Sequence, residues 1–189
     1  MGTDYSDLEI VADFFNTHDK RTRFEGDEGV EHLTSPKTLY SWLLKHHFIF
    51  EEDIVTDEDL SLVIKLRTEA RKMIVNNQFN KTDDNGLKTL NKLITQFTFS
   101  IEFSPESEKL LPNKGGGSSG IARLTLLIFD LKRSGLWHRI RVCSAEDCQW
   151  VFVDYSKPGT GKWCIMSACG NRAKNKTYRQ KLKHTSDSP

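Results

Sequence analysis

The chain lacks any long apolar run and carries almost no net charge. Its 189 residues include 27 Lys and Arg against 26 Asp and Glu, so the formal net charge is +1. No stretch approaches the ~18 apolar residues that a membrane-spanning helix needs, which excludes a membrane protein. No basic segment followed by an apolar one stands at the N-terminus, so we expect a cytoplasmic protein. The hydrophobic content of 37% is enough for a core, which excludes a collagenous or wholly disordered chain.

The small net charge hides an uneven distribution along the chain. Residues 1–130 carry 15 basic and 22 acidic side chains, a net charge of −7, whereas residues 131–189 carry 12 and 4, a net charge of +8. This asymmetry suggests that one end of the chain contacts nucleic acid or another acidic surface. The alternative is an intramolecular contact, in which the basic end docks on the acidic part.

Cysteine is scarce and equally localised. The sequence has four, Cys143, Cys148, Cys164 and Cys169, as two C-x4-C pairs separated by fifteen residues. Two such pairs can converge on one tetrahedral ion, and four thiolates leave no open coordination position. We therefore predict one structural Zn2+ per chain. Two disulfides are the alternative, but they would need an oxidising compartment.

The residues around the cysteines predict a treble-clef-like zinc finger made of a knuckle, a β-hairpin and a helix. Residues 139–142 and 150–155 are rich in β-branched and aromatic side chains, which favours short strands. Residues 157–161 predict a turn, after which residues 162–164 can return as the second arm of a hairpin. Residues 172–183 contain no Gly or Pro and predict a helix. Zinc would fold this segment, which is too small to make its own core.

The helix predicted after the cysteines carries a cationic stripe. Its basic residues, uninterrupted by any acidic one, are Arg172, Lys174, Lys176, Arg179, Lys181 and Lys183. Four of them stand at i, i+4, i+7 and i+11, which places them along one helical face. Asn171 adds a side chain able to pair with adenine. Because such a stripe matches a phosphate backbone, we expect double-stranded DNA as the partner; an ordinary solvated helix face is the alternative.

The acidic residues 1–134 predict a mainly helical domain. Ser6-Asp7-Leu8-Glu9 looks like a capping box that opens a first helix. Ser35-Pro36 opens a second helix, and Thr56 caps a longer third one. Another helical pattern covers about residues 84–96. These signals, combined with the finger, indicate an α+β fold class.

A short β element and a glycine-rich segment complete this domain. Residues 97–103 alternate Phe and Ile with polar residues, which predicts a strand with one buried face. Residues 112–120 have the glycine spacing of a phosphate loop but lack the Lys-Ser/Thr that must follow, which excludes an NTPase. We interpret them as a flexible turn entering a buried helix over residues 121–133. That helix leads without a linker into the zinc finger, predicted at residues 135–185 with a tail at 186–189.

A polar cluster follows the first predicted helix. Asn16, His18, Asp19 and Arg21 are close enough in sequence to line a ligand pocket. Hydrogen bonding at the helix end is the alternative. No nucleophile or open metal site accompanies these residues, so we do not expect an enzyme, although an N-terminal active site is a further alternative.

Several short motifs over about residues 135–181 form a recognisable combination. Trp163-Cys164 precedes the tetrapeptide Cys169-Gly170-Asn171-Arg172. The other matching residues are Trp137-His138-Arg139, Arg141-Val142-Cys143, Asp147-Cys148, Phe152, Asp154, Ala173-Lys174 and Tyr178-Arg179. Together they resemble the bacterial CGNR zinc-finger family.

The acidic part resembles the ABATE domain that usually precedes this finger. The similarity is carried by Phe14-Phe15-Asn16-Thr17 with Asp19 and Arg21, by Leu39-Tyr40-Ser41-Trp42-Leu43 and by Leu111-Pro112. The family usually has Leu-Asp at Ala12-Asp13 and Phe-Val at Phe14-Phe15. The resemblance implies a stress-responsive bacterial transcriptional regulator that binds DNA through the finger.

We therefore expect the acidic domain to sense a small-molecule effector or to form a homodimer. The alternative function is a protein- or ligand-binding adaptor, in which zinc is purely structural and no nucleic acid is bound.

Overall fold

The computed structural model describes residues 5–22, 24–105 and 107–186, with side chains up to Gln180. Its helices are α1 (Ser6–Asn16), α2 (Pro36–Lys45), α3 (Asp57–Phe79), α4 (Asp84–Ile94), α5 (Gly116–Arg133) and α6 (Asn171–Ser186). Its strands are β1 (His18–Asp19), β2 (Val30–Glu31), β3 (Phe99–Phe103), β4 (Glu108–Pro112), β5 (Ile140–Val142) and β6 (Val151–Val153). The described strands pair as three antiparallel hairpins, β1 with β2, β3 with β4 and β5 with β6. The predicted α+β class is confirmed.

Capping side chains set where two of the helices begin. Ser35 and Thr56 each accept a hydrogen bond from the backbone N–H three residues further on, and the side chain of that residue accepts one in return. The capping box predicted at Ser6-Asp7-Leu8-Glu9 is wrong, because α1 already includes Ser6. Its N-cap residue is Tyr5, whose side chain makes no capping hydrogen bond. The start of α1 is held instead by packing, since Leu8 is fully buried.

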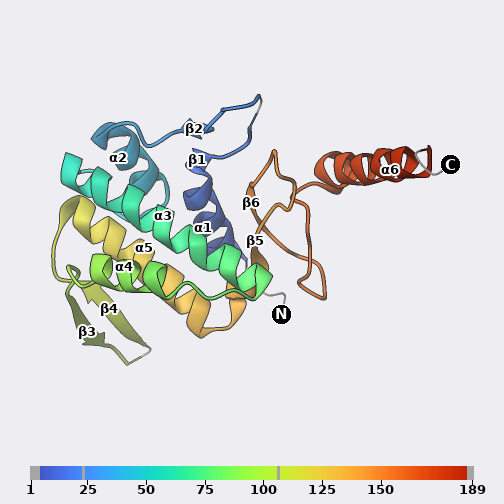
Figure 1. Ribbon diagram of the computed structural model, residues 1–189. Coiled ribbons are helices and arrows are strands. Elements are labelled where there is room, and N and C mark those ends of the chain that lie inside the picture. The colour runs from blue at the N-terminus through green and yellow to red at the C-terminus, as the bar shows by residue number, and fades with distance from the viewer. Residues whose placement is uncertain (1–4, 23, 106, 187–189) are drawn as a thin grey trace.

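The core lies among α1, α2, α3 and α5, and it continues into β5 and β6 (Figure 1). Its fully buried side chains include Leu8, Val11, Phe14, Phe15, Leu39, Leu43, Val63, Leu66, Ile74, Ile121, Leu124 and Ile140. Val142 and Val151 belong to the same cluster, so the β5–β6 hairpin of the predicted zinc finger shares a core with the N-terminal helices. The division at residues 134 and 135 stays a prediction, while apolar packing runs across it.

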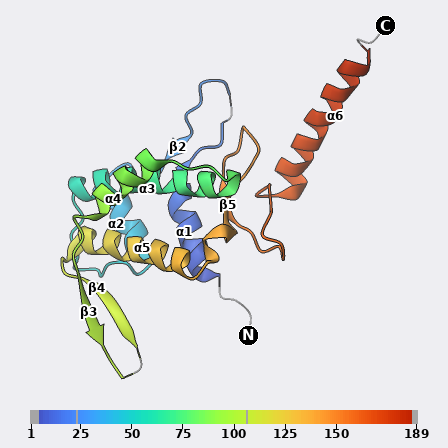
Figure 2. The same cartoon turned by 60° about the horizontal axis from the view of Figure 1, so that its bottom comes forward.

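The hairpin of β3 and β4 projects from this core (Figure 2). The strand over residues 99–103 was expected, but its predicted buried face is wrong beyond Phe99. Ile101 and Phe103 are 62% and 75% exposed, because no second layer covers the outer half of the hairpin. The alternating pattern therefore predicted the strand correctly, but it predicted the burial of its apolar face wrongly.

The glycine-rich segment, predicted as a flexible turn over residues 112–120, is helical from Gly116 onward. α5 starts at Gly116, whose φ is +66°, and its first N–H groups donate to Asp53 Oδ1 at 3.0 Å and to the Ile54 carbonyl at 2.8 Å. A Cβ at Gly120 would stand 2.7 Å from Ile49 Cγ2, so glycine lets this turn pack closely. The N–H groups that a phosphate loop would offer to a ligand are thus used by the chain itself.

The helix predicted to be buried over residues 121–133 is part of α5 and is buried on one side only. Leu124, Ile128 and Leu131 are buried, whereas Phe129 is 53% exposed.

Among the described helices, none combines the length and apolarity that crossing a membrane requires.

Candidate metal centre and basic helix

The four cysteines come together at one point beside the core. Their Sγ atoms all lie within 4.8 Å of one another. The Sγ atom of Cys164 is 3.6 Å from that of Cys148 and 3.7 Å from that of Cys169. Four sulfurs at the usual zinc–sulfur distance of about 2.3 Å form a tetrahedron with edges of about 3.8 Å. These separations are far too long for disulfides, whose sulfurs are about 2.05 Å apart, and they fit a four-thiolate zinc site.

Backbone hydrogen bonds shape the knuckle that carries the first cysteine pair. β5 ends just before Cys143, whose N–H donates to the Trp150 carbonyl at 2.8 Å. The N–H of Cys148 donates to the Ala145 carbonyl at 3.0 Å. Gln149 then adopts a left-handed φ of +50°, which turns the chain into β6. The first pair is thus held inside the loop of the β5–β6 hairpin.

The finger contains a hairpin, but the pairing predicted between residues 150–155 and 162–164 is wrong. β6 pairs with β5, with Ile140 opposite Val153, whereas residues 162–164 form no strand. The segment that returns to the knuckle is attached by a backbone bond from Ser144 N–H to the Lys162 carbonyl at 2.8 Å. It leads to the π-helical turn η2 (Met166–Gly170), which contains Cys169 and runs directly into α6.

The thiols differ in how readily they lose their protons. Burial raises the pKa of Cys148 to about 11 and raises that of Cys164 as well. At Cys143 burial acts in the same direction, but hydrogen bonds from the backbone N–H groups of Cys164 and Ala145 outweigh it and lower the pKa. Bound zinc would displace these protons, and all four sulfurs would then hold it as thiolates.

Two arginines lie beside this centre and offset its negative charge. Arg172 Nη2 donates to Cys169 Sγ at 3.3 Å. The guanidinium of Arg21 lies 4.4 Å from the ring centroid of Trp150, in a groove that Cys148 and Cys164 also line. The hydrogen bond that Arg21 donates to Asp19 is the largest cause that raises the pKa of Arg21, and attraction to Cys148 and Cys164 adds to it. Outer-shell contacts of this kind stabilise a bound metal.

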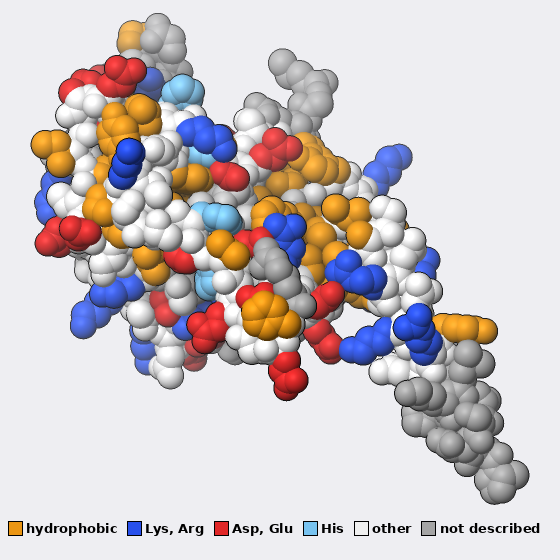
Figure 3. Space-filling model, turned by 90° about the horizontal axis from the view of Figure 1, so that it is seen from above, with side chains coloured by type: hydrophobic (Ala, Val, Ile, Leu, Met, Phe, Trp, Pro, Cys, Tyr) orange, Lys and Arg blue, Asp and Glu red, His pale blue; other side chains and the backbone are white. Residues whose placement is uncertain are grey.

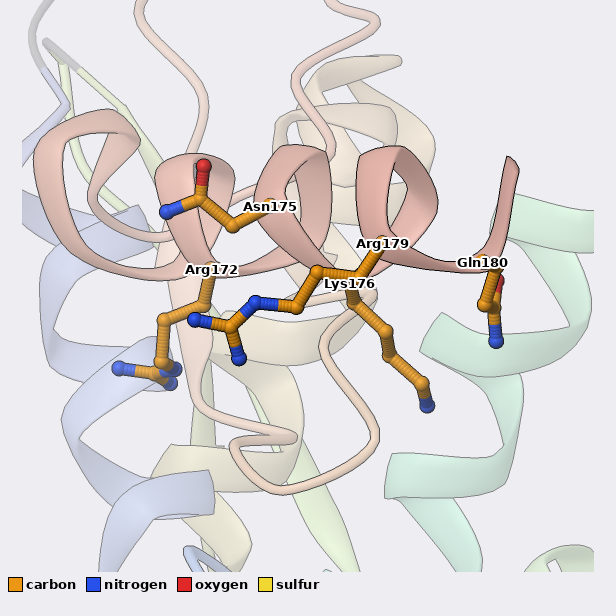
Figure 4. Close-up of a pocket in the computed structure, with 5 residues that line it drawn as sticks. All are labelled: Arg172, Asn175, Lys176, Arg179 and Gln180. Atoms are coloured by element: carbon orange, nitrogen blue, oxygen red, sulfur yellow. The ribbon is translucent and has the colours of Figure 1, made fainter. Parts of the chain in front are cut away.

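The basic helix α6 projects away from the rest of the molecule (Figures 1 and 2). The side chains of Asn171, Arg172, Lys174, Lys176 and Arg179 are exposed. Figure 3 shows Lys and Arg side chains along the described part of α6. In Figure 4, Arg172, Lys176 and Arg179 extend from the same side of the helix, where they line a groove with Asn175 and Gln180. Lys181 and Lys183 lie within α6, but their side chains are outside the described part.

Two residues of the cationic stripe are paired with acidic residues of the knuckle. Arg172 Nη2 lies 3.2 Å from Asp147 Oδ2, and Lys176 Nζ lies 2.8 Å from Glu146 Oε2. Both pairs are exposed to solvent, which screens them, so each adds little to stability. These two pairs join the first half of α6 to the knuckle. No described side chain of α6 pairs with an acidic residue in residues 1–134, so the alternative of docking on the acidic part is not the arrangement seen.

The polar cluster after α1 is divided between different partners. Asn16 Nδ2 donates to the Val151 carbonyl at 2.8 Å, and its Oδ1 accepts from Val151 N–H at 2.9 Å. Asp19 accepts from Arg21 Nε at 2.8 Å, and His18 Nε2 lies 3.2 Å from the Glu28 carbonyl. Asn16 and Arg21 thus reach the zinc finger at separate places. A ligand pocket formed by the four residues stays a prediction.

Two residues of α3 that sequence reasoning missed also hold the finger. Arg71 donates to the carbonyls of Phe15 and Gln149, and burial lowers its pKa to about 10. Gln78 Nε2 donates to the Val142 carbonyl at 2.9 Å, and Gln78 Oε1 accepts from Val142 N–H at 2.8 Å. The signal was an arginine inside an apolar helical stripe, between Ala70 and Ile74, where only a satisfied charge can be buried.

Comparison with protein families supports two parts of the chain separately. A family model described as "CGNR zinc finger" matches residues 139–181. A second, ABATE, described as "Putative stress-induced transcription regulator", matches residues 8–119, which is more than half of the chain. Comparison with curated proteins gives no match. Both resemblances expected from the sequence are confirmed, and the four clustered cysteines form the zinc site of the finger.

Proposed function

Since the chain belongs to the ABATE family and carries a CGNR zinc finger, we propose that it is a regulator that binds duplex DNA through α6. The observation that carries this proposal is the exposure of Arg172, Lys174, Lys176 and Arg179 on a helix that projects from the body (Figure 3). A helix about 10–12 Å in diameter enters a major groove about 12 Å wide. Basic side chains along such a helix neutralise phosphates on the groove walls.

Zinc has a structural role in this proposal. When bound, it ties the knuckle to η2, and thereby fixes the start of α6 relative to the hairpin. Four thiolate ligands leave no open position for a water or substrate, so the ion takes no part in a reaction. We propose that the protein acts in the bacterial cytoplasm, because thiols stay reduced there, as zinc binding requires, and DNA is present there.

The N-terminal part would control how the finger is presented. Asn16 of α1 and Arg71 and Gln78 of α3 donate hydrogen bonds to the β5–β6 hairpin and its loop. A shift of these helices would therefore move the finger with them. Binding of a small-molecule effector, or assembly into a homodimer, is the input that we propose for this part.

The first test is the salt dependence of DNA binding. Fluorescence anisotropy with mixed duplex fragments should show affinity falling linearly on a log–log plot against salt. Replacing Arg172, Lys176 and Arg179 by Ala removes three exposed charges from α6. We expect the slope to decrease by about one unit for each phosphate that the variant no longer neutralises.

The matched control replaces Lys37, Lys88 and Lys92, which are exposed lysines of α2 and α4, by Ala. It removes the same charge from a different part of the chain and should leave the slope unchanged. Equal weakening by both triple variants would show that binding follows net charge alone, and unchanged binding by the α6 variant would reject the assigned face.

One observation favours the adaptor as a second candidate function. Arg172 and Lys176 are already paired with Asp147 and Glu146, so part of the stripe is neutralised within the finger. Zinc-loaded protein that binds no duplex at low salt would support the adaptor, because the exposed Lys174 and Arg179 would then have no phosphate partner either.

A further inference from the structure

The hairpin of β3 and β4 has an apolar face that extends beyond the core. Phe99, Ile101 and Phe103 alternate along β3, and the register places Leu110 directly opposite Ile101. Opposite residues of an antiparallel pair share one face of the sheet. Phe99 packs on the core, whereas Ile101, Phe103 and Leu110 are exposed. Their exposure leaves a projecting apolar ridge.

A groove of about 920 Å3 lies beside this ridge. Its lining includes the exposed residues of the hairpin, Leu126, Leu127 and Phe129 of α5, and Ile10 of α1. Its charged side chains are three acidic and three basic ones, Asp7, Glu108, Asp130, Lys109, Arg123 and Arg133. An exposed apolar surface of this kind marks an interaction site.

We propose that this ridge and groove form the surface through which two copies of the chain associate around a two-fold axis. An interface of this symmetry must be complementary to itself, because the same patch occurs on both sides. A ridge beside a groove meets that requirement in shape, since each hairpin can lie in the groove of the other copy.

The charges and the strand edges support a second copy over other occupants. Asp130 and Arg133 pair with each other within α5 at 3.4 Å. The other charged side chains of the groove are two acidic and two basic ones, which can pair with their two-fold copies and do not attract a partner of a single charge sign. The described β3–β4 sheet has only two strands, so both outer edges carry backbone groups without a strand partner. A strand from a second copy can satisfy them.

Association through this surface leaves the basic helix accessible. The β3–β4 hairpin and α6 project from opposite ends of the molecule (Figures 1 and 2). The inference rests on the assembly role proposed above and assigns it to a surface. Its test does not use DNA, so its failure would be distinct from failure of the DNA-binding proposal.

Sedimentation equilibrium of the full, zinc-loaded chain tests this surface. We expect a concentration-dependent dimer for the unaltered protein. Phe103→Arg places a charge at the tip of the ridge, which would be buried in the groove of the other copy, and should raise the dimer Kd by about 30-fold or more. Leu110→Glu, on the facing strand, should have a similar effect.

The control is Phe24→Arg, on the loop between β1 and β2 and outside the surface. Phe24 is 71% exposed and Phe103 is 75% exposed, so the two substitutions perturb the fold equally little. The control should leave the dimer Kd unchanged, and circular dichroism and zinc content should match in all variants.

Three outcomes would overturn the proposal. The unaltered chain could sediment as a monomer at every concentration, the two hairpin variants could dimerise normally, or the control could dissociate as they do. A monomer that binds the apolar dye anilinonaphthalene sulfonate, with binding abolished in Phe103→Arg, would assign the groove to a small ligand.

Discussion

Cys164 is the one zinc ligand that is only half-buried, and its sulfur lies within 3.7 Å of those of Cys148 and Cys169. Cys164→Ser replaces a thiolate by a hydroxyl, which is a much weaker zinc ligand. Elemental analysis should give one zinc per chain for the unaltered protein and almost none for this variant. Thr160→Ser, an exposed change in the same finger, is the control. Full zinc content in Cys164→Ser would contradict the four-ligand site.

Asp13 provides a pH-dependent contribution to stability. It accepts hydrogen bonds from Trp42 Nε1 and His46 Nε2, each at 2.9 Å. Burial acts to raise its pKa, but these two bonds and the nearby charge of Lys45 outweigh burial and lower the pKa below the usual value. A lowered pKa in the folded state gives stability that is present above the unfolded-state pKa of about 3.9 and is lost as pH falls through the folded-state value.

The corresponding prediction compares Asp13→Asn with the unaltered chain. Urea unfolding at pH 7 should show a loss of about 1 kcal/mol, the usual net value of a hydrogen bond at a partly exposed site. The difference between the two proteins should shrink as pH falls below about 4, where the unaltered carboxylate becomes protonated. Glu52→Gln, at an exposed position, should show neither effect. A difference that stays constant down to a pH of about 3 would argue against a role for the charge of Asp13.

Among the elements, α6 depends most on the metal. It packs chiefly on η2, and it has almost no apolar surface to bury against the core. An isolated helix of this length is marginal in water. Removal of zinc by a chelator should therefore abolish helical ellipticity equivalent to about the 16 residues of α6, while the N-terminal helices persist. Amide hydrogen exchange should locate the loss after residue 165, and protection of α6 without zinc would contradict this dependence.

The hydrogen bond from α3 to the knuckle leads to a separate prediction. Arg71 donates to the carbonyl of Gln149, between Cys148 and β6. Arg71→Met removes the donor to the buried Phe15 carbonyl and to the partly buried Gln149 carbonyl, and a buried carbonyl that stays unsatisfied costs about 1–3 kcal/mol. We expect zinc transfer to a colorimetric chelator to become faster. Lys72→Met, one position along α3 but exposed, is the control and should transfer zinc at the normal rate.

Sequence predicted those elements whose signals are local. Ser35 and Thr56 reveal helix starts because a cap needs only residues three positions apart. The cysteine spacing revealed the zinc site for a similar reason. The burial of β3 was predicted wrongly, because alternation shows that a strand has an apolar face and does not show what covers it. The second hairpin arm predicted at residues 162–164 was also wrong, because β6 pairs with β5, the strand that precedes the knuckle.

At the scale of the whole molecule, the attachments between the two parts were beyond sequence reasoning. Asn16 and Val151 are bonded through both polar atoms of the amide although they are 135 positions apart. Nothing in either local pattern indicates the other. The charge asymmetry was visible in the sequence, but only the structure shows that the basic helix α6 projects and that its described ion pairs stay within the finger.

The bond between α1 and β6 also constrains how the protein can be made. During synthesis α1 leaves the ribosome before its partners Trp137 and Val151, which follow more than a hundred residues later. The apolar face of α1 therefore stays partly uncovered until these partners have also been translated. Folding of the nascent chain is completed by its last third, so premature termination before β6 would yield an unfinished core that is open to degradation.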